Sequence, residues 1–425
     1  MAGILLITVF VLGYIAIAFE HPLKLNKAAS ALITGVLCWT IYMLQSSVTH
    51  TVGEELIHHL GEIAGILFFL LGAMTIVELI DTHNGFDIIT QKINTNSTSR
   101  LLVIIAVVTF LLSALLDNLT TSIVMASLVT KILTNKEDKL WFCGMIVIAA
   151  NAGGAWSPLG DVTTTMLWIG GQITAINIMK QLILPSIAVC TLPVMYMAWL
   201  FRGKKFQAID HPQTSRKERS DGQIVLFSGV GFLIFVPIFK TLTHLPPFMG
   251  MLLALGMMWV LTTIIHKSKE AEVAEKYTVT RALQTVDSPS VLFFLGILLA
   301  VSALQSFGIL HDLAEFLNKT LKNDYLIGTT LGLLSALVDN VPLVAASQGM
   351  YDLSVYPTDH PFWEFLALTT GTGGSAIIIG SAAGVAVMGI EKIDFIWYLK
   401  KISWLALLGF VAGIGVFLLQ LNLQH

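Results

Sequence analysis

Charged residues are scarce in this chain of 425 residues. Asp, Glu, Lys and Arg make up 12% of it, against 55% hydrophobic residues, and the formal net charge is −3. Soluble globular domains carry about 25% charged residues, so the composition excludes the soluble classes. The small net charge also argues against a nucleic-acid partner held by bulk charge. The sequence therefore predicts a multi-pass protein whose main partner is the lipid bilayer.

Cysteine is also scarce. Cys38, Cys143 and Cys190 each lie in an apolar run, and their spacing fits neither a metal site nor a disulfide framework. We interpret them as packing residues and predict no cofactor. Lys and Arg are missing ahead of the first apolar run, 3–19, although a signal peptide normally begins with positive charge. This run is interpreted as the first membrane span.

Apolar runs of the right length for a membrane recur along the chain. A bilayer core about 30 Å thick takes roughly 20 apolar residues in a helix. Such runs lie near 3–19, 28–45, 61–80, 182–201, 223–240, 248–266, 288–305 and 402–421.

Four other apolar segments are interrupted. Asp-Asn pairs divide 101–133 and 326–348 into arms that we expect to be too short to span with ease. Glycine clusters break 141–178 and 363–390, which are too long for one straight helix. Irregular backbone is tolerated at membrane depth only where protein or a water-filled cavity supplies hydrogen bonds. We therefore expect the two hairpin tips and the two broken helices to converge.

The interruptions of the second half match those of the first. SALLDNLTTS at 113–122 recurs as SALVDNVPLV at 335–344, and NAGGAWSPLGD at 151–161 recurs as GTGGSAIIIGS at 371–381. The offset stays between about 220 and 225 residues, which indicates an internal repeat.

The predicted fold is an all-α polytopic membrane protein with two inverted-topology repeats. Each repeat has five transmembrane helices plus one re-entrant hairpin, and some helices are discontinuous. An odd number of crossings inverts the second copy. The predicted parts are a first repeat at 1–201, a cytoplasmic basic linker at 202–222 and a second repeat at 223–425.

Basic residues support this topology. Loops 46–60, 241–247 and 349–362 are placed outside and contain no Lys or Arg, as the positive-inside rule requires. Lys180, Lys319 and Lys322 are exceptions on the outer side. The linker carries Arg202, Lys204, Lys205, Arg216, Lys217 and Arg219.

Carboxylates stand at the interruptions without a neighbouring base. Asp117, Asp161 and Asp339 are accompanied there by hydroxyls, amides and glycine carbonyls. An aspartate at the bilayer centre costs about 2.5 to 3.5 kcal/mol on insertion scales, so its presence in both halves favours a function. Hard cations such as Na⁺ favour oxygen ligands. The sequence therefore predicts a cation site that also binds protons.

The predicted site takes its residues from both halves. Na⁺ itself is assigned to the hairpin tips, Asp117, Asn118, Asp339 and Asn340. The full set of cation- and proton-binding residues is Asp117, Asn118, Asp161, Asp339, Asn340, Ser113, Thr120, Asn151, Gly153, Gly154, Ser157, Thr163, Thr164, Ser335, Thr372, Ser375 and Ser381.

Each assignment has a structural alternative. Asp117 and Asn118 could cap a helix, since Asp and Asn are preferred N-caps. Gly153 and Gly154 could serve close helix packing, for which small residues are common in membranes. Thr163 and Thr164 could bond back to their own helix. His58, His59 and His83 are expected in loops or at span ends with solvated side chains.

The interruptions also resemble a known family. The run SALLDNLTT, followed by NAGG and GD, a second Asp-Asn and TGTGGS, is similar to the ion transporter superfamily, which includes arsenite pumps and dicarboxylate carriers. The nearest resemblance is to its NhaD-type sodium/proton antiporter branch. The resemblance implies a scaffold domain, a transport domain, a homodimer, and exchange of Na⁺ or Li⁺ for H⁺ in a bacterial inner membrane.

The chain differs from the dicarboxylate carriers, and its two halves differ from each other. Where hairpin tips of those carriers read Ser-Asn-Thr, this chain has Asp117-Asn118-Leu119 and Asp339-Asn340-Val341, which fits a cation site. Ser381 stands where the second half would repeat Asp161, so the two half-sites are expected to differ.

Two other functions compete with cation exchange. A Na⁺-coupled carrier of dicarboxylate or an arsenite-like anion would need a basic residue or a wider hydroxyl cluster at the substrate position. An intramembrane aspartyl protease would use Asp117 and Asp161 as a pair sharing one proton. The repeated motif has no role in peptide hydrolysis, so no enzymatic activity is predicted.

Overall fold

The computed structural model describes residues 2–18, 20, 24–46, 49–86, 95–206, 216–267 and 277–424. In these ranges the chain is built of helices, and β pairing is limited to an isolated bridge between Ser97 and Lys205. The all-α prediction is confirmed. The part of the linker at 207–215 lies outside the described residues.

The first half of the chain contains α1 to α10. Their bounds are α1 (Ala2–Ala18), α3 (Lys27–Gln45), α4 (Thr49–Thr82), α6 (Thr98–Leu116), α7 (Asn118–Ile132), α8 (Lys136–Ala155), α9 (Val162–Ile169) and α10 (Ala175–Leu200).

The second half contains α11 to α22. Their bounds are α11 (Arg216–Thr243), α12 (Pro247–His266), α14 (Val279–Thr285), α15 (Ser288–Ser306), α16 (Ile309–Leu321), α17 (Asp324–Leu334), α18 (Asn340–Met350), α19 (Pro361–Gly373), η1 (Gly374–Ala376), α20 (Ala382–Glu391), α21 (Phe395–Lys401) and α22 (Ser403–Gln424).

Eight of the described helices are long and apolar enough to cross a membrane: α3, α4, α6, α10, α11, α12, α15 and α22. The expectation of short hairpin arms is therefore wrong for α6, which has 19 residues, although α17 has only 11. α11 begins at Arg216, inside the predicted linker, and the division into two repeats and a linker stays a prediction.

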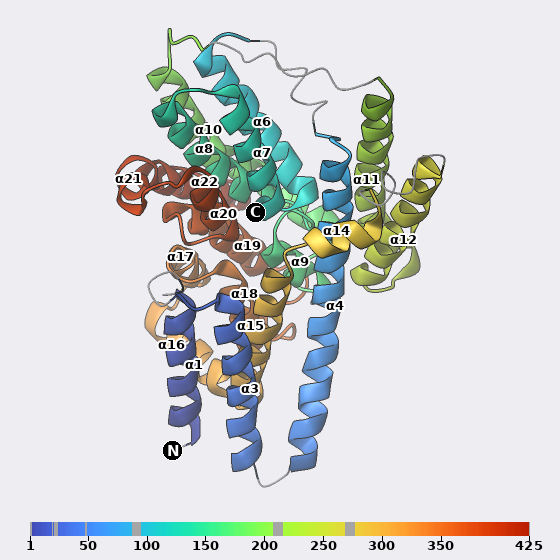
Figure 1. Cartoon of the computed structure of the whole chain (residues 1–425). Coiled ribbons are helices and arrows are strands. Elements are labelled where there is room, and N and C mark those ends of the chain that lie inside the picture. The colour runs from blue at the N-terminus through green and yellow to red at the C-terminus, as the bar shows by residue number, and fades with distance from the viewer. Residues whose placement is uncertain are drawn as a thin grey trace.

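The helices pack in two groups (Figure 1). In the first, which we call the frame, α3 packs on α1 and α15, and α4 packs on α12 and α15. In the second, which we call the site bundle, α8 packs on α6 and α7, α17 on α19, and α10 on α22. The two groups meet mainly where α15 contacts α18 and α4 contacts α9. All four interrupted segments belong to the site bundle.

The interruptions lie slightly later than the glycine clusters suggested. Gly153 and Gly154 are still inside α8, and the irregular backbone runs from Trp156 to Asp161. The predicted break in 141–178 is therefore present, but it begins after Ala155 and excludes the glycine pair. In the second half α19 and η1 likewise continue to Ala376 before the chain breaks.

The glycines let each hairpin touch its broken helix by backbone contact. A Cβ on Gly153 would lie 2.2 Å from the Phe110 carbonyl oxygen, and one on Gly373 would lie 2.0 Å from that of Gly332. The two contacts are related by the same offset of about 220 residues that the sequence repeats. Close packing thus explains these glycines, and the inverted orientation of the halves stays a prediction.

Candidate cation site

Asp161 is an almost fully enclosed carboxylate of the site bundle. It is the N-cap of α9, and its Oδ1 accepts hydrogen bonds from the Thr163 backbone N–H at 2.9 Å and from the Thr163 hydroxyl at 2.8 Å. Only 1% of its surface is exposed. The positive end of the short helix stabilises negative charge at this position.

The asparagines of both hairpin tips reach Asp161. Asn118, at the start of α7, donates from Nδ2 to Asp161 Oδ2 at 2.7 Å. Asn340, at the start of α18, has Nδ2 3.4 Å from both Asp161 carboxylate oxygens. The predicted convergence of the hairpin tips is therefore present, and its centre is a carboxylate from the first broken helix.

Asn151 connects the two broken helices. Its Oδ1 accepts a hydrogen bond from Asn118 Nδ2 at 3.0 Å. Its Nδ2 donates to the hydroxyls of Ser375 and Ser381, each at 2.9 Å. Ser381 is the N-cap of α20, as Asp161 is of α9, so the predicted correspondence between these two residues holds in the structure.

Asp117 and Asp339 are helix caps. Asp117 accepts the Thr120 backbone N–H at 2.7 Å and the Thr120 hydroxyl at 2.9 Å. Asp339 accepts the Val341 backbone N–H at 3.2 Å. In the described part of the chain, the lysine ion pairs involve Asp138 and Glu315 rather than these aspartates or Asp161. Three carboxylates thus lie near one another without a direct basic partner.

Several other predicted residues hold the hairpins in place. Ser113 donates to the Ala150 carbonyl at 2.6 Å, and Ser335 donates to the Thr370 carbonyl at 3.0 Å, which fastens each hairpin to its broken helix. Ser157 donates to the Ala114 carbonyl at 2.5 Å.

Two predicted threonines make only backbone bonds through their hydroxyls. Thr164 donates to the carbonyls of Ser157 and Asp161, at 2.8 and 2.9 Å. Thr372 donates to the Leu368 carbonyl at 2.5 Å, one turn earlier in α19. In this conformation both hydroxyls have their protons directed at the backbone, so only their remaining lone pairs could face a cation.

Sequence reasoning missed two charged residues, one in the second broken helix and one beside the second hairpin tip. Glu364 lies within the interrupted segment 363–390, is 1% exposed, and accepts a hydrogen bond from Asn177 Nδ2 at 2.6 Å. Its position in an apolar run could have revealed it. Lys27, at the start of α3, lines a cavity with Asp339. Because the two residues are far apart in the sequence, nothing in the sequence indicated that they lie close together. The expectation of a solvated His83 was also wrong: it is 3% exposed, with Nε2 2.7 Å from Nε2 of His266.

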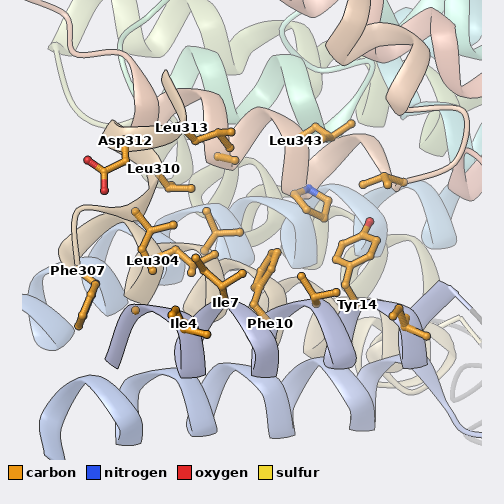
Figure 2. Close-up of a pocket in the computed structure, with 18 residues that line it drawn as sticks. Ile4, Ile7, Phe10, Tyr14, Leu304, Phe307, Leu310, Asp312, Leu313 and Leu343 are labelled. Carbon is orange, nitrogen blue, oxygen red and sulfur yellow. The ribbon is translucent and has the colours of Figure 1, made fainter. Parts of the chain in front are cut away.

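The largest cavity described is not the ion site. Figure 2 shows this groove of about 830 Å³ between α1, α15, α16 and α18, with Ile4, Ile7 and Phe10 pointing into it. Its walls are almost wholly hydrocarbon, which cannot replace the hydration shell of an ion. Tyr14 at one end also lines a smaller cavity of about 70 Å³ that contains Asp339 and Ser381.

These features define a polytopic membrane transporter with a buried polar centre between broken helices. The family described as citrate transporter (CitMHS) matches residues 14–371. The chain belongs to this family, and its relatives place it with the NhaD-type members of the ion transporter superfamily.

Three relatives cover nearly the whole chain. Sodium/proton antiporter 1 of Arabidopsis thaliana is 46% identical over 98% of this chain and 72% of its own length. Sodium/proton antiporter 2 of the same plant is 44% identical over 96% of this chain and 97% of its own. The Na⁺/H⁺ antiporter NhaD of Vibrio cholerae is 32% identical over 100% of this chain and 92% of its own length.

A solved structure shares the fold. The YdaH transporter of Alcanivorax borkumensis superposes with a TM-score of 0.60, covering 100% of this chain and 98% of its own, at 11% sequence identity. At this identity the likeness concerns the arrangement of helices alone.

Proposed function

We propose that this protein exchanges Na⁺ for H⁺ across its membrane, with Li⁺ as a second transported cation. The observation that carries the proposal is the environment of Asp161. Its carboxylate is 1% exposed and accepts hydrogen bonds from the asparagines of both hairpin tips. Relatives named sodium/proton antiporters at 46 and 44% identity support the same activity.

The chemistry follows from burial. A carboxylate without water or a basic partner is costly while charged, and either a proton or a bound cation removes that cost. One group cannot hold both at full strength, so Na⁺ and H⁺ compete. The Asn118 and Asn151 side-chain carbonyls, with the hydroxyls of Thr120 and Thr163, are the oxygen ligands that a hard cation favours. Asp117, Asp161 and Asp339 supply the charge.

Coupled exchange then needs one further rule. If the site changes its side of access only when its charge is neutralised, Na⁺ leaves on one side whenever protons are taken up on the other. This rule is part of the proposal and is supported by the discontinuous helices, which mark the substrate site in secondary transporters.

The anion-carrier alternative has one point in its favour, the name of the family. Three carboxylates around Asn118, Asn151 and Asn340 would repel a dicarboxylate, and Lys27 is the one described base that shares a cavity with any of them. The protease alternative lacks its dyad: in the described structure Asp161 is bonded to Asn118 and Thr163, and Asp117 to Thr120.

The proposal also covers the membrane in which the protein lies and its oligomeric state. The bacterial NhaD relatives support a bacterial inner membrane, with a role in pH homeostasis, and a homodimer is proposed from the superfamily resemblance. Membrane fractionation and the mass of the detergent-solubilised protein test these two statements.

Flux in proteoliposomes tests the function. We expect Na⁺, and more weakly Li⁺, to drive proton movement reported by a trapped pH dye, whereas K⁺ and citrate do not. Asp161→Asn should lose more than about tenfold of this flux, because the titratable charge is gone. Ser381→Ala, at the matching cap, should keep most of it. Citrate uptake without proton exchange would contradict the proposal, and equal effects of the two substitutions would remove Asp161 from the site.

A further inference from the structure

The small cavity beside Asp339 joins the frame to the site bundle. Its walls come from α1 and α3 in the frame and from the α17–α18 hairpin and α20 in the site bundle, and it contains about 70 Å³. Its polar lining includes Glu20, Lys27, Asp339 and Ser381, with the Tyr14 ring beside them. The cavity therefore leads from the turn between α1 and α3 to the tip of the second hairpin.

Lys27 is placed against the usual preference of a helix. It is the first residue of α3, where the helix dipole disfavours positive charge. The N-terminus is already capped, because the Asn26 side chain accepts the Ala28 N–H at 2.8 Å. The Lys27 Nζ lies 4.8 Å from the centre of the Phe293 ring, a cation–π contact that holds the ammonium over α15 at the cavity wall. Helix formation thus does not account for this lysine.

Asp339 accepts fewer hydrogen bonds than the other two site carboxylates. Its described hydrogen bond is the one from Val341 N–H at 3.2 Å, whereas Asp161 accepts bonds from Thr163 and Asn118 at 2.7 to 2.9 Å. A half-buried carboxylate with a single described donor is stabilised by a nearby positive charge. Lys27 is the base on the wall of the same cavity as Asp339.

We propose that Lys27 is a tethered cation that competes with Na⁺ for Asp339. The cavity has room for a cation with only a few waters, and a lysine ammonium and a sodium ion in it repel each other. Na⁺ therefore binds at the second hairpin only while the ammonium stays over Phe293, as in this structure, and does not pair with Asp339. Lys27 in this way sets the affinity for Na⁺ on the side where the α1–α3 turn lies, which the charge pattern assigns to the cytoplasm.

This inference rests on the proposed Na⁺/H⁺ exchange and deepens it. It also explains why a lone lysine near the site does not indicate an anion carrier, since its charge is directed at a carboxylate of the protein itself. The first half of the chain has no described equivalent, because Asp117 is satisfied by Thr120 instead.

Everted vesicles, whose outer face is the cytoplasmic one, test the role of Lys27. The measurement is the KM for Na⁺ in Na⁺-induced dequenching of a pH dye. Lys27→Met should lower this KM about tenfold, which corresponds to about 1.4 kcal/mol, because removing the ammonium removes its repulsion of Na⁺ in the cavity. Lys27→Arg keeps the charge and should stay near wild type. Lys27→Gln provides a second neutral variant should Lys27→Met fail to insert.

Lys24→Met is the matched control, because Lys24 is an exposed lysine in the same turn and lines no described cavity. An unchanged or raised KM in both neutral variants would overturn the role of Lys27. A uniform loss of maximal rate with the same KM would show that the lysine is structural. Absence of any Na⁺-driven signal in the wild type would instead contradict the proposed exchange, so the two failures are distinguishable.

Discussion

Asp117 and Asp339 occupy matching tips of the two hairpins but differ in backbone conformation. Asp117 has φ 82° and ψ 159°, a region that is essentially restricted to glycine, whereas Asp339 has φ −46° and ψ 137°. Such a conformation costs on the order of 1 to 3 kcal/mol and persists only where the surroundings impose it. A carboxylate kept at a position that suits glycine indicates that the side chain is needed there.

Substitution at Asp117 should separate strain from function. Both Asp117→Gly and Asp117→Ala remove the cap on α7, but only glycine relieves the backbone. We therefore expect the Gly variant to be more stable than the Ala variant by about 1 kcal/mol, and both to lose coupled exchange. Thermal unfolding can be followed with a thiol-reactive dye, because Cys38, Cys143 and Cys190 are buried and free. The reverse order of stability would show that the backbone at Asp117 is unstrained.

The sequence predicted which residues gather but not how they are paired. The Asp-Asn repeat and its cost in a membrane were enough to indicate Asp117, Asn118 and Asp161. That Asn118, rather than Asp117, reaches Asp161 depends on the turn at the hairpin tip, which only the folded chain defines. Lys27 could not be predicted, because its position beside Asp339 results from packing between the two groups of helices.

At the level of elements, glycines determine how closely the hairpins approach the broken helices. The breaks themselves follow the sequence loosely: the first begins after Ala155, next to Pro158, rather than at the Gly153-Gly154 pair. Composition indicated that these segments are interrupted, but helix propensity is too weak to locate the last helical residue. The first hairpin arm was predicted too short, because α6 begins at Thr98, ahead of the apolar run that starts at 101.

Adding one methyl group should reveal the close contacts. Gly153→Ala and Gly373→Ala would each place Cβ within 2.2 Å of a carbonyl oxygen, so the helices must move apart at a cost of about 1 to 3 kcal/mol. Gly415→Ala, in α22 with no neighbouring atom within 4 Å, is the control and should be neutral or slightly stabilising. Equal melting temperatures for all three variants would mean that the hairpins do not pack this tightly.

At the scale of the whole molecule, the helices are arranged as in a membrane protein, and the site bundle encloses the polar centre. Hydropathy predicted most of the spans, because a bilayer fixes their length. It could not predict that α4 extends over 34 residues, well beyond the apolar stretch, or that the described α1, Ala2–Ala18, is shorter than the other spans. The orientation of the halves rests on the number of crossings and on charge, and it stays a prediction.

Cysteine labelling tests that orientation. Arg202 is an exposed residue of the basic linker, and Ser354 is exposed in the loop between α18 and α19. We expect a membrane-impermeant thiol reagent to modify Ser354→Cys in intact cells, and Arg202→Cys only after the inner face is opened. The native cysteines are buried and give a low background. Labelling of Arg202→Cys from outside would reverse the proposed topology.

The difference between Asp161 and Ser381 has an evolutionary consequence. An ancestor that assembled from two identical half-length chains would have carried the same residue at both caps, so that any change at one would also change the other. Once the halves are joined in one polypeptide, each cap mutates on its own. A single aspartate shared by both hairpins therefore requires that the two caps be encoded separately, and Asn151, which donates to both Ser375 and Ser381, ties the two unequal caps together.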